Sequence, residues 1–306
     1  MSPLESALAD YLTIRRALGH KLVKVERLLR QFIAYLEERG AETITVDDAL
    51  AWATAPGGTL AWHYTRLSAV RGFAAYLQTI DPACELPPGL LSARLRRASP
   101  YIYSERQLAG LLAATDTLST PHRAATYRTL IGLLAVTGMR IGEAISLDRG
   151  DIDLEAEVLL IRDTKFGKTR ELALHGSTAA ALRRYRRRRD RPRCPAGSGA
   201  FFVSVRGERL HYRSVQWGFG RLLEEAEIGP RSASCRPRLH DLRHTFAVGT
   251  LLEGYRQGGD VEGRLAALST YLGHIEPANT YWYLSAAPEL MELAAERLEL
   301  HLGDRT

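Results

Sequence analysis

The spacing of apolar and polar residues over the first 80 positions predicts a bundle of helices. Apolar residues recur every three or four positions in 4–18 and again in 21–39, as on the buried face of an amphipathic helix. A cap-like segment, 45–48, precedes a short third helix, and a proline- and glycine-containing turn precedes a fourth over 60–78. Residues 1–98 are therefore predicted to form a small all-helical domain.

The pattern changes after residues 81–88 and 95–100, which are rich in proline and polar residues and which we interpret as an interdomain linker. Beyond it, periodic segments predict further helices at 104–112, 122–136, 139–147, 215–227, 239–247, 265–272 and 288–300. Short apolar runs at 158–161 and 171–174 flank a glycine-containing turn and predict a hairpin, and 201–203 predict another short strand. The fold class is then mainly α with a small antiparallel β-sheet, in two domains, 1–98 and 99–306.

Composition narrows the class of protein. The 306 residues carry a net charge of +6, which favours a polyanionic partner. The three cysteines, Cys84, Cys194 and Cys235, form no close pair in the sequence, so neither a disulfide framework nor a zinc knuckle is expected. We expect the protein to occupy a reducing compartment. We find no signal peptide and no apolar run that could cross a bilayer, so a soluble cytoplasmic protein without a membrane segment is expected.

The segment 239–247 carries the most distinctive chemistry. His240, Arg243 and His244 stand at i, i+3 and i+4, so a helix projects them from one face. Three interpretations remain open from these residues alone. One is a solvated helix with a hydrogen-bonded histidine. Another is a zinc site of the zincin type, with Asp241 where that motif has its glutamate. The third is a clamp for a phosphate, because a guanidinium offers paired donors and an imidazole adds one more.

A second candidate cation, Arg140, follows the glycine break at Gly138 and opens a helix. The helix macrodipole disfavours a cation there unless an anion joins it, and the alternative is a surface ion pair with Glu143. Basic residues elsewhere are interpreted either as solvated faces or as contacts with a DNA backbone. Those in the first domain and linker are Lys21, Lys24, Arg27, His63, Arg66, Arg71, Arg96 and Arg97. We interpret the densest basic run, 183–193, as a solvated helix end near DNA.

Five motifs in order carry a family resemblance: Thr-Gly-Met-Arg140, Lys165, His240-Asp-Leu-Arg243-His, Leu-Gly-His274 and Tyr283. With them the chain resembles the tyrosine recombinase (phage integrase) family, in the two-domain form of its Xer-like members. The resemblance implies a helical, SAM-like core-binding domain followed by an α+β catalytic domain. It also implies site-specific recombination of DNA, for integration, excision or transposon-associated exchange, without a metal or cofactor.

The resemblance implies a role for each motif residue. Tyr283 would attack a phosphodiester and form a 3′-phosphotyrosyl link, while Arg140 and Arg243 hold the non-bridging oxygens. Lys165 would protonate the departing 5′-oxygen, His240 would assist proton transfer, and His274 would donate to the phosphate. Competing assignments exist for two of these roles. Lys168 lies on the same hairpin as Lys165, and Tyr281 lies two residues before Tyr283. Glu143 is expected to orient Arg140 or His240, and His244 to be structural.

The expected partner is a double-stranded recombination site, bound by a homotetramer or by a heterotetramer with related recombinases, in the bacterial nucleoid. The helix 288–300 would dock either into a neighbouring protomer or onto its own. Two other functions stay open: a topoisomerase of type IB, and a catalytically silent DNA-binding accessory protein.

Overall fold

The computed structural model describes residues 2–55, 57–90, 99–162, 169–190, 199–257, 260–273, 278–281, 283 and 290–292. The chain divides into two compact units, 1–97 and 98–306. Each unit has buried apolar clusters of its own.

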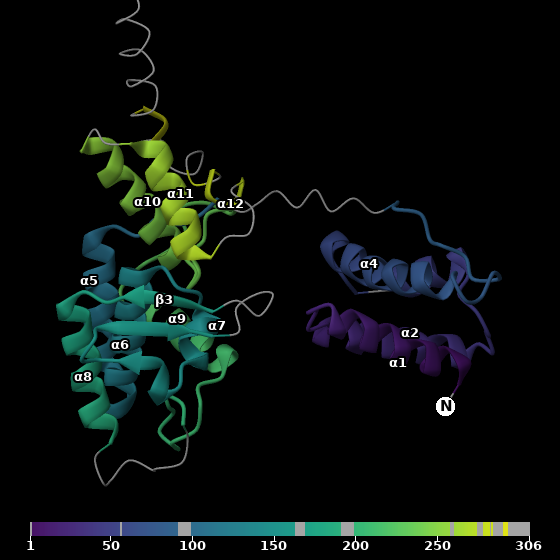
Figure 1. Ribbon diagram of the computed structural model, residues 1–306, viewed down its shortest axis with the longest axis horizontal. Coiled ribbons are helices and arrows are strands. Elements are labelled where there is room, and N and C mark those ends of the chain that lie inside the picture. The colour runs from purple at the N-terminus through teal and green to yellow at the C-terminus, as the bar shows by residue number, and fades with distance from the viewer. Residues whose placement is uncertain are drawn as a thin grey trace, which may run out of the picture. The chain divides into compact units, whose positions relative to one another are not determined.

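Helices build the first unit (Figure 1). In its described residues these are α1 (Pro3–Ala17), α2 (Val23–Glu38), α3 (Val46–Thr54) and α4 (Leu60–Leu77). Their apolar stripes meet in a core that includes Leu29, Phe32 and Phe73, each fully buried. Ser2, Thr45 and Thr59 cap α1, α3 and α4 by accepting a backbone N–H of the first turn. The four predicted helices are present, and α1, α2 and α4 lie within two residues of their expected bounds.

The segment 81–88 differs from the expected linker, because much of it packs on the first unit. Cys84 is only 2% exposed and joins the core of that unit. The backbone N–H of Glu85 donates to the carbonyl oxygen of Ile44 at 2.8 Å, and its carboxylate accepts from the N–H of Val46. Polar composition alone does not distinguish a free linker from a segment that pairs with a loop 39 residues away.

The second unit combines helices with one small sheet. Its helices are α5 (Glu105–Ala114), α6 (Pro121–Thr137), α7 (Ile141–Ser146), α8 (Gly176–Arg189), α9 (Tyr212–Glu225), α10 (Asp241–Arg256), α11 (Val261–Leu272) and α12 (Ala278–Tyr281). Two single 3₁₀ turns, η1 (Thr115–Thr117) and η2 (Arg149–Asp151), follow α5 and α7. Residues 290–292 are helical as well, within the C-terminal helix predicted from the sequence. Among the described residues, no helix is both long and apolar enough to span a bilayer.

The sheet is antiparallel, in the order β1 (Ile152–Asp153), β2 (Val158–Ile161) and β3 (Arg170–Ala173). Leu159 pairs with Leu172 and both are buried, whereas Leu160 pairs with the exposed Glu171. One face therefore packs against the core of the unit, as the alternation in these strands predicts. Residues 201–203 form no strand. They are buried as expected, but they make only isolated bridges, because Phe201 and Phe202 pack against the ring of Tyr185 instead of pairing along a sheet.

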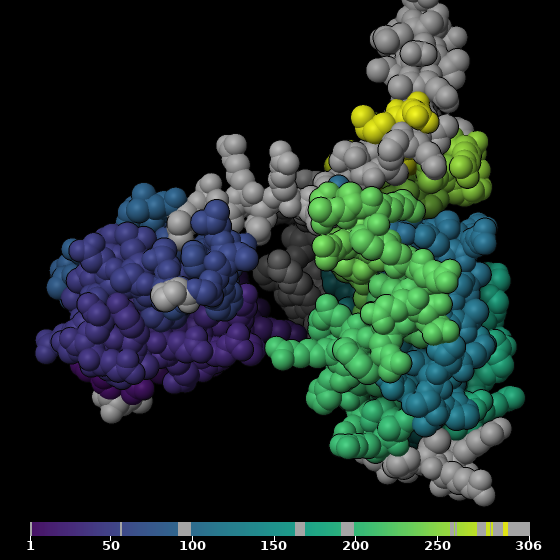
Figure 2. All heavy atoms as spheres, turned by 180° about the vertical axis from the view of Figure 1, so that it is seen from behind, coloured from purple at the N-terminus to yellow at the C-terminus, as the bar shows by residue number. Residues whose placement is uncertain are grey.

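Helix α6 is the central element of the second unit. It contacts α8 on one part of its length and α10 on another, and α10 in turn packs on α11 (Figure 1). Seen from behind, the blue residues of α5 adjoin the green residues of α9 (Figure 2). The cluster between α10 and α11 includes Leu251, Leu268, Leu272 and Tyr283. This packing brings the C-terminal ends of α6 and α11 to the first turn of α10.

Candidate active site

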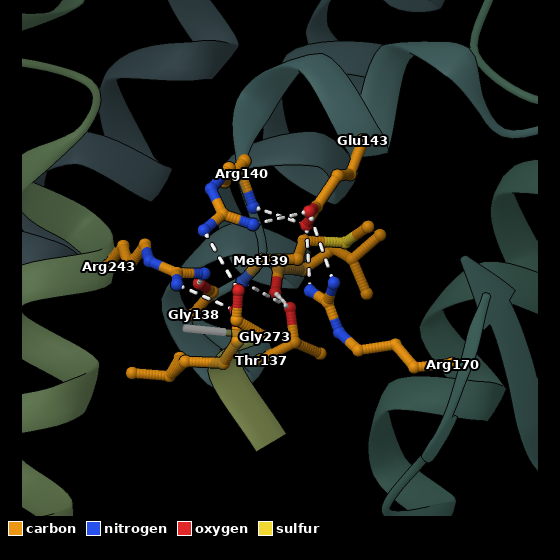
Figure 3. Close-up of polar contacts among 10 residues, drawn as sticks. Thr137, Gly138, Met139, Arg140, Glu143, Arg170, Arg243 and Gly273 are labelled. Carbon is orange, nitrogen blue, oxygen red and sulfur yellow. Dashed lines mark hydrogen bonds and ion pairs between the residues drawn. The ribbon is translucent and has the colours of Figure 1, made fainter. Parts of the chain in front are cut away.

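Two helix C-termini converge on the buried guanidinium of Arg243 (Figure 3). Helix α6 ends at Gly138, with φ +59°, and α11 ends at Gly273, with φ +66°. Arg243 donates through Nη1 to the carbonyl oxygen of Gly138 at 2.8 Å, and through Nη2 to that of Leu272 at 2.7 Å. The last carbonyls of a helix lack partners within it and carry partial negative charge. The backbone therefore both orients the Arg243 side chain and stabilises its charge.

The environment lowers the pKa of Arg243 to about 10. Burial is the main cause, since the residue is 2% exposed, and the nearby charge of Arg140 acts in the same direction. Interaction with Tyr283, partly through a hydrogen bond, and with Glu143 acts in the opposite direction. The guanidinium stays protonated at neutral pH, so the site keeps a buried cation next to a phenol.

Arg140 is the N-cap residue of α7 and the more accessible of the two cations. Its side chain is 35% exposed. Its Nη1 donates to Glu143 Oε1 at 2.9 Å, its backbone N–H donates to Glu143 Oε2 at 2.9 Å, and its Nη2 reaches the carbonyl oxygen of Gly273 at 3.3 Å. A cation at a helix N-terminus needs a nearby anion. For Arg140 at the start of α7, that anion is the carboxylate of Glu143, three residues further along the chain. The pair predicted from the sequence exists, but it is not a surface pair, because the Glu143 side chain is only 9% exposed.

Glu143 also binds a residue that the sequence analysis missed, Arg170 on β3. Arg170 donates to Oε1 at 3.2 Å and to Oε2 at 2.8 Å, so the carboxylate accepts four hydrogen bonds (Figure 3). Burial alone would raise the pKa of Glu143, but the hydrogen bonds from Arg170 and Arg140 outweigh it and lower that pKa. The signal for Arg170 in the sequence is its phase: it stands two positions before the buried Leu172, on the side of β3 that faces inward.

Three aromatic rings lie in a row beside Arg243. The ring of His240 is 4.8 Å from that of His244, and the ring of His244 is 5.4 Å from that of Tyr283, measured between centroids, both edge to face. Tyr283 is 2% exposed, whereas Tyr281 is 56% exposed. Of the two candidate tyrosines, the structure therefore brings Tyr283 to the arginines.

The sequence predicted His240 to lie within a helix. The structure instead makes it the N-cap of α10, which begins at Asp241. The pKa of His240 is lowered, first by the partial desolvation of its ring and then by the charge of Arg243, while Asp241 acts in the opposite direction. The imidazole is accordingly neutral at neutral pH and can accept a proton.

Asp241 does not fit the zincin interpretation. It is fully buried, and its carboxylate accepts hydrogen bonds from the backbone N–H, Nε and Nη2 of Arg238, at 2.8, 3.1 and 2.9 Å. A carboxylate bound in this way is not available as the general base that the motif requires. Within the described part of the chain, no cluster of three or more histidines, cysteines or carboxylates could hold a metal ion.

Several predicted residues lie outside the described residues. These are Lys165 and its competitor Lys168, His274, the linker arginines Arg96 and Arg97, and most of the helix 288–300. The basic residues of the first unit are described. Lys21, Lys24 and Arg27 are exposed, and His63, Arg66 and Arg71 are partly buried.

Two of these cations stack on tryptophans. The guanidinium carbon of Arg66 is 3.9 Å from the ring of Trp52, and Lys24 Nζ is 5.1 Å from that of Trp62. Burial lowers the pKa of Arg66.

The sequence profile of the phage integrase family matches residues 103–289. The chain is 43% identical to integrase/recombinase y4rB of Sinorhizobium fredii, with both chains fully covered. It is 34% identical to tyrosine recombinase XerD of Mycobacterium tuberculosis, with 90% of each covered. The chain belongs to the phage integrase family. This integrase is a site-specific DNA recombinase of the tyrosine type, as the sequence resemblance predicted.

Solved structures agree on the fold of the integrase. The XerH recombinase bound to its palindromic difH substrate after cleavage is 20% identical, with a TM-score of 0.64, over 89% of this chain and 78% of that one. The Tn1549 transposon integrase bound to transposon right-end DNA is 19% identical, with a TM-score of 0.62, over 95% of this chain and 99% of that one. The predicted fold class, mainly helical with a small antiparallel sheet, is confirmed.

Proposed function

We propose that the integrase breaks and rejoins DNA through a covalent link to Tyr283, with Arg140 and Arg243 binding the phosphate. The observation that carries this proposal is the position of Tyr283, which interacts with the buried Arg243 while the neighbouring Arg140 remains partly open to solvent. A phosphate that reaches Arg140 would then be held close to the phenol. Two guanidiniums oriented before the substrate arrives stabilise the charge that develops on the phosphorus oxygens.

The step balances without an external energy source. The phenol oxygen attacks phosphorus as its proton leaves, the bond from phosphorus to the 5′-oxygen breaks, and that oxygen takes up a proton. A free phenol has a pKa of about 10 and attacks poorly while protonated, so a base must assist. His240, neutral at neutral pH, is the described group suited to that role. We assign protonation of the 5′-oxygen to Lys165 and a further phosphate contact to His274. The 3′-phosphotyrosine keeps the bond energy, so a new 5′-hydroxyl reverses the step.

We propose that the first unit also contacts the duplex. Exposed Lys21, Lys24 and Arg27 suit contacts with phosphates, which fix position without reading bases. His63, Arg66 and Arg71 on α4, with Arg96 and Arg97 after it, would extend the same contact. The relatives bound to DNA recombination sites support a duplex as the partner.

Exchange between two sites needs four cleavages, so we propose four copies on two duplexes, either all of this chain or mixed with related recombinases. The helix 288–300 would dock into a neighbouring protomer. A chain truncated after Ala287 should then bind a single site but fail to bring two sites together in size-exclusion chromatography. Unchanged pairing of sites would reject docking between protomers. Because the proposed substrate is DNA, the proposed location is the cytoplasm, at the nucleoid.

A nicked suicide duplex tests the chemistry, because cleavage releases a short strand and traps the covalent adduct. The duplex is built from the inverted repeat that the protein selects out of a randomised pool. Wild type and Tyr281→Phe should form the adduct, and Tyr283→Phe should form none. An adduct with Tyr283→Phe would show that another residue is the nucleophile. Absence of an adduct from the wild type would favour a silent accessory protein, and relaxation of a plasmid that lacks the site would favour a topoisomerase.

A further inference from the structure

Arg170 occupies a position that neither the motifs nor the proposed mechanism uses. Its side chain is 15% exposed, and it is the first residue of β3, five positions after Lys165 in the sequence. Both terminal nitrogens donate to the two oxygens of Glu143, the paired geometry that a guanidinium and a carboxylate make best. Its Nε is buried and has no hydrogen-bond partner among the residues that the structure describes. A buried N–H without a partner lowers the stability of the fold. This loss of stability points to a functional reason for the position of Arg170.

The contacts of Arg170 connect three segments that are distant in sequence (Figure 3). Through Glu143 it reaches the first turn of α7, where Glu143 holds both the backbone and the guanidinium of Arg140. Through direct packing it reaches the end of α11, because a Cβ added to Gly273 would lie 2.9 Å from Arg170 Nη1. The carbonyl oxygen of that same Gly273 accepts from Arg140. Over the described ranges of the chain, Arg140 therefore donates to Glu143 and to Gly273, and Arg170 lies against both.

From this arrangement we infer that Arg170 is a positioning residue for DNA cleavage, which sets the orientation of Arg140 through Glu143 and the Gly273 turn. The inference rests on the proposed function, since it assumes that Arg140 binds the reacting phosphate. Without Arg170, the Glu143 carboxylate keeps Arg140 as its partner but loses the contact that fixes its own rotamer. Arg140 then still carries its charge, and DNA still binds. The N–H groups of Arg140, however, no longer keep a single orientation toward the phosphate.

The test compares Arg170→Gln with Arg128→Gln in the same nicked-duplex assay. Arg128 is a matched control, because it also joins two elements of the second unit through a carboxylate, Asp116, and two further oxygen acceptors. Partners that orient metal-binding side chains typically contribute about 10- to 100-fold to activity, and we take the same range for Arg170. We expect adduct formation at saturating protein to slow by about that factor in Arg170→Gln, with the Kd for the duplex within about threefold of wild type. Arg128→Gln should lose thermal stability and keep its rate.

Two further readouts separate positioning from general damage to the fold. Arg170→Gln and Glu143→Gln should not be additive, so the double variant should be about as slow as the slower single one. Loss of Arg170 also removes the largest hydrogen-bonding contribution that keeps the pKa of Glu143 low, while burial continues to raise it. The acid limb of the rate profile should therefore move to higher pH. Arg170→Lys keeps the positive charge but not the paired donors of the guanidinium. It should therefore bring the acid limb back toward its wild-type pH more fully than it restores the rate.

The outcomes distinguish this inference from the function on which it rests. An active wild type with Arg170→Gln within threefold of it would overturn the inference alone, as would multiplicative losses in the double variant. An equal loss of rate in Arg128→Gln would overturn it as well, since any damaged contact would then have the same effect. A wild type that forms no adduct would overturn the proposed function and the inference together.

Discussion

Replacing Gly138 with alanine tests whether the backbone end of α6 sets the active site. The residue has φ +59°, where a side chain costs about 1–2 kcal/mol. An added Cβ would also lie 2.4 Å from Phe246 Cδ1 and 3.1 Å from Leu272 Cδ2, and crowding of this kind in a packed core costs about 1–3 kcal/mol. Together the variant should lose about 2–5 kcal/mol of unfolding free energy.

The same substitution should lower activity by more than stability explains. Relief of the clash moves the carbonyl oxygen that accepts from Arg243 and so displaces the Arg243 guanidinium. If Arg243 donates to the reacting phosphate as proposed, loss of one such donor costs about 10²–10³ in rate. Urea unfolding gives the stability, and adduct formation below the unfolding transition gives the rate.

Gly132→Ala is the matched control, because it lies in the interior of the same helix with nothing within 4 Å of its added Cβ. It should gain about 0.5–1 kcal/mol, the usual difference between glycine and alanine in a helix. Equal stability of the two variants would refute the argument, and so would a fully active Gly138→Ala.

Three further outcomes are expected. Gly218→Ala should cost about 1–3 kcal/mol in urea unfolding, because its Cβ would lie 2.3 Å from the Tyr127 hydroxyl oxygen, whereas Gly220→Ala on the same helix meets nothing within 4 Å and should cost none. The pKa of His240 is below its ordinary 6.5, so its contribution to stability is complete above pH 6.5 and is lost as pH falls. Unfolding at pH 7.5 and 5.5 should show a smaller decrease for His240→Gln than for wild type; an equal decrease would contradict this. Lys21→Gln should weaken DNA binding and reduce the slope of log K against log salt by about 0.9, if this side chain contacts one phosphate.

Local patterns predicted the elements well where each element depends on nearby residues. The sequence Ser104-Glu105-Arg106-Gln107 has the pattern of a capping box, and both hydrogen bonds of that box form. The strands β2 and β3 lie within one residue of their predicted bounds, because the pattern of apolar residues in each strand is local. Helix α11 begins four residues earlier than predicted, since Asp260 caps a turn that contains Gly263, and glycine lowers the apparent helical signal.

The candidate site was harder to predict, because its contacts join distant parts of the chain. The ordered motifs indicated Arg140 and Arg243, but nothing near Arg243 indicates that its partner is a carbonyl 105 residues earlier. Glu143 was expected to orient Arg140 or His240, and it contacts Arg140. Arg170 was missed because its partner is 27 residues away and a strand arginine is usually solvated. The roles assigned to the motif residues remain predictions that the adduct assay tests.

The carbonyl oxygens that hold Arg243 belong to the main chain, and this affects how the enzyme can vary. A main-chain oxygen is retained whatever amino acid occupies its position, so drift in the surrounding side chains does not delete the acceptors. Sensitivity to mutation is concentrated at the positions whose backbone angles aim those oxygens, Gly138 above all. A recombinase adapted to a new target sequence can thus exchange many residues around Arg243, provided that this turn keeps its shape.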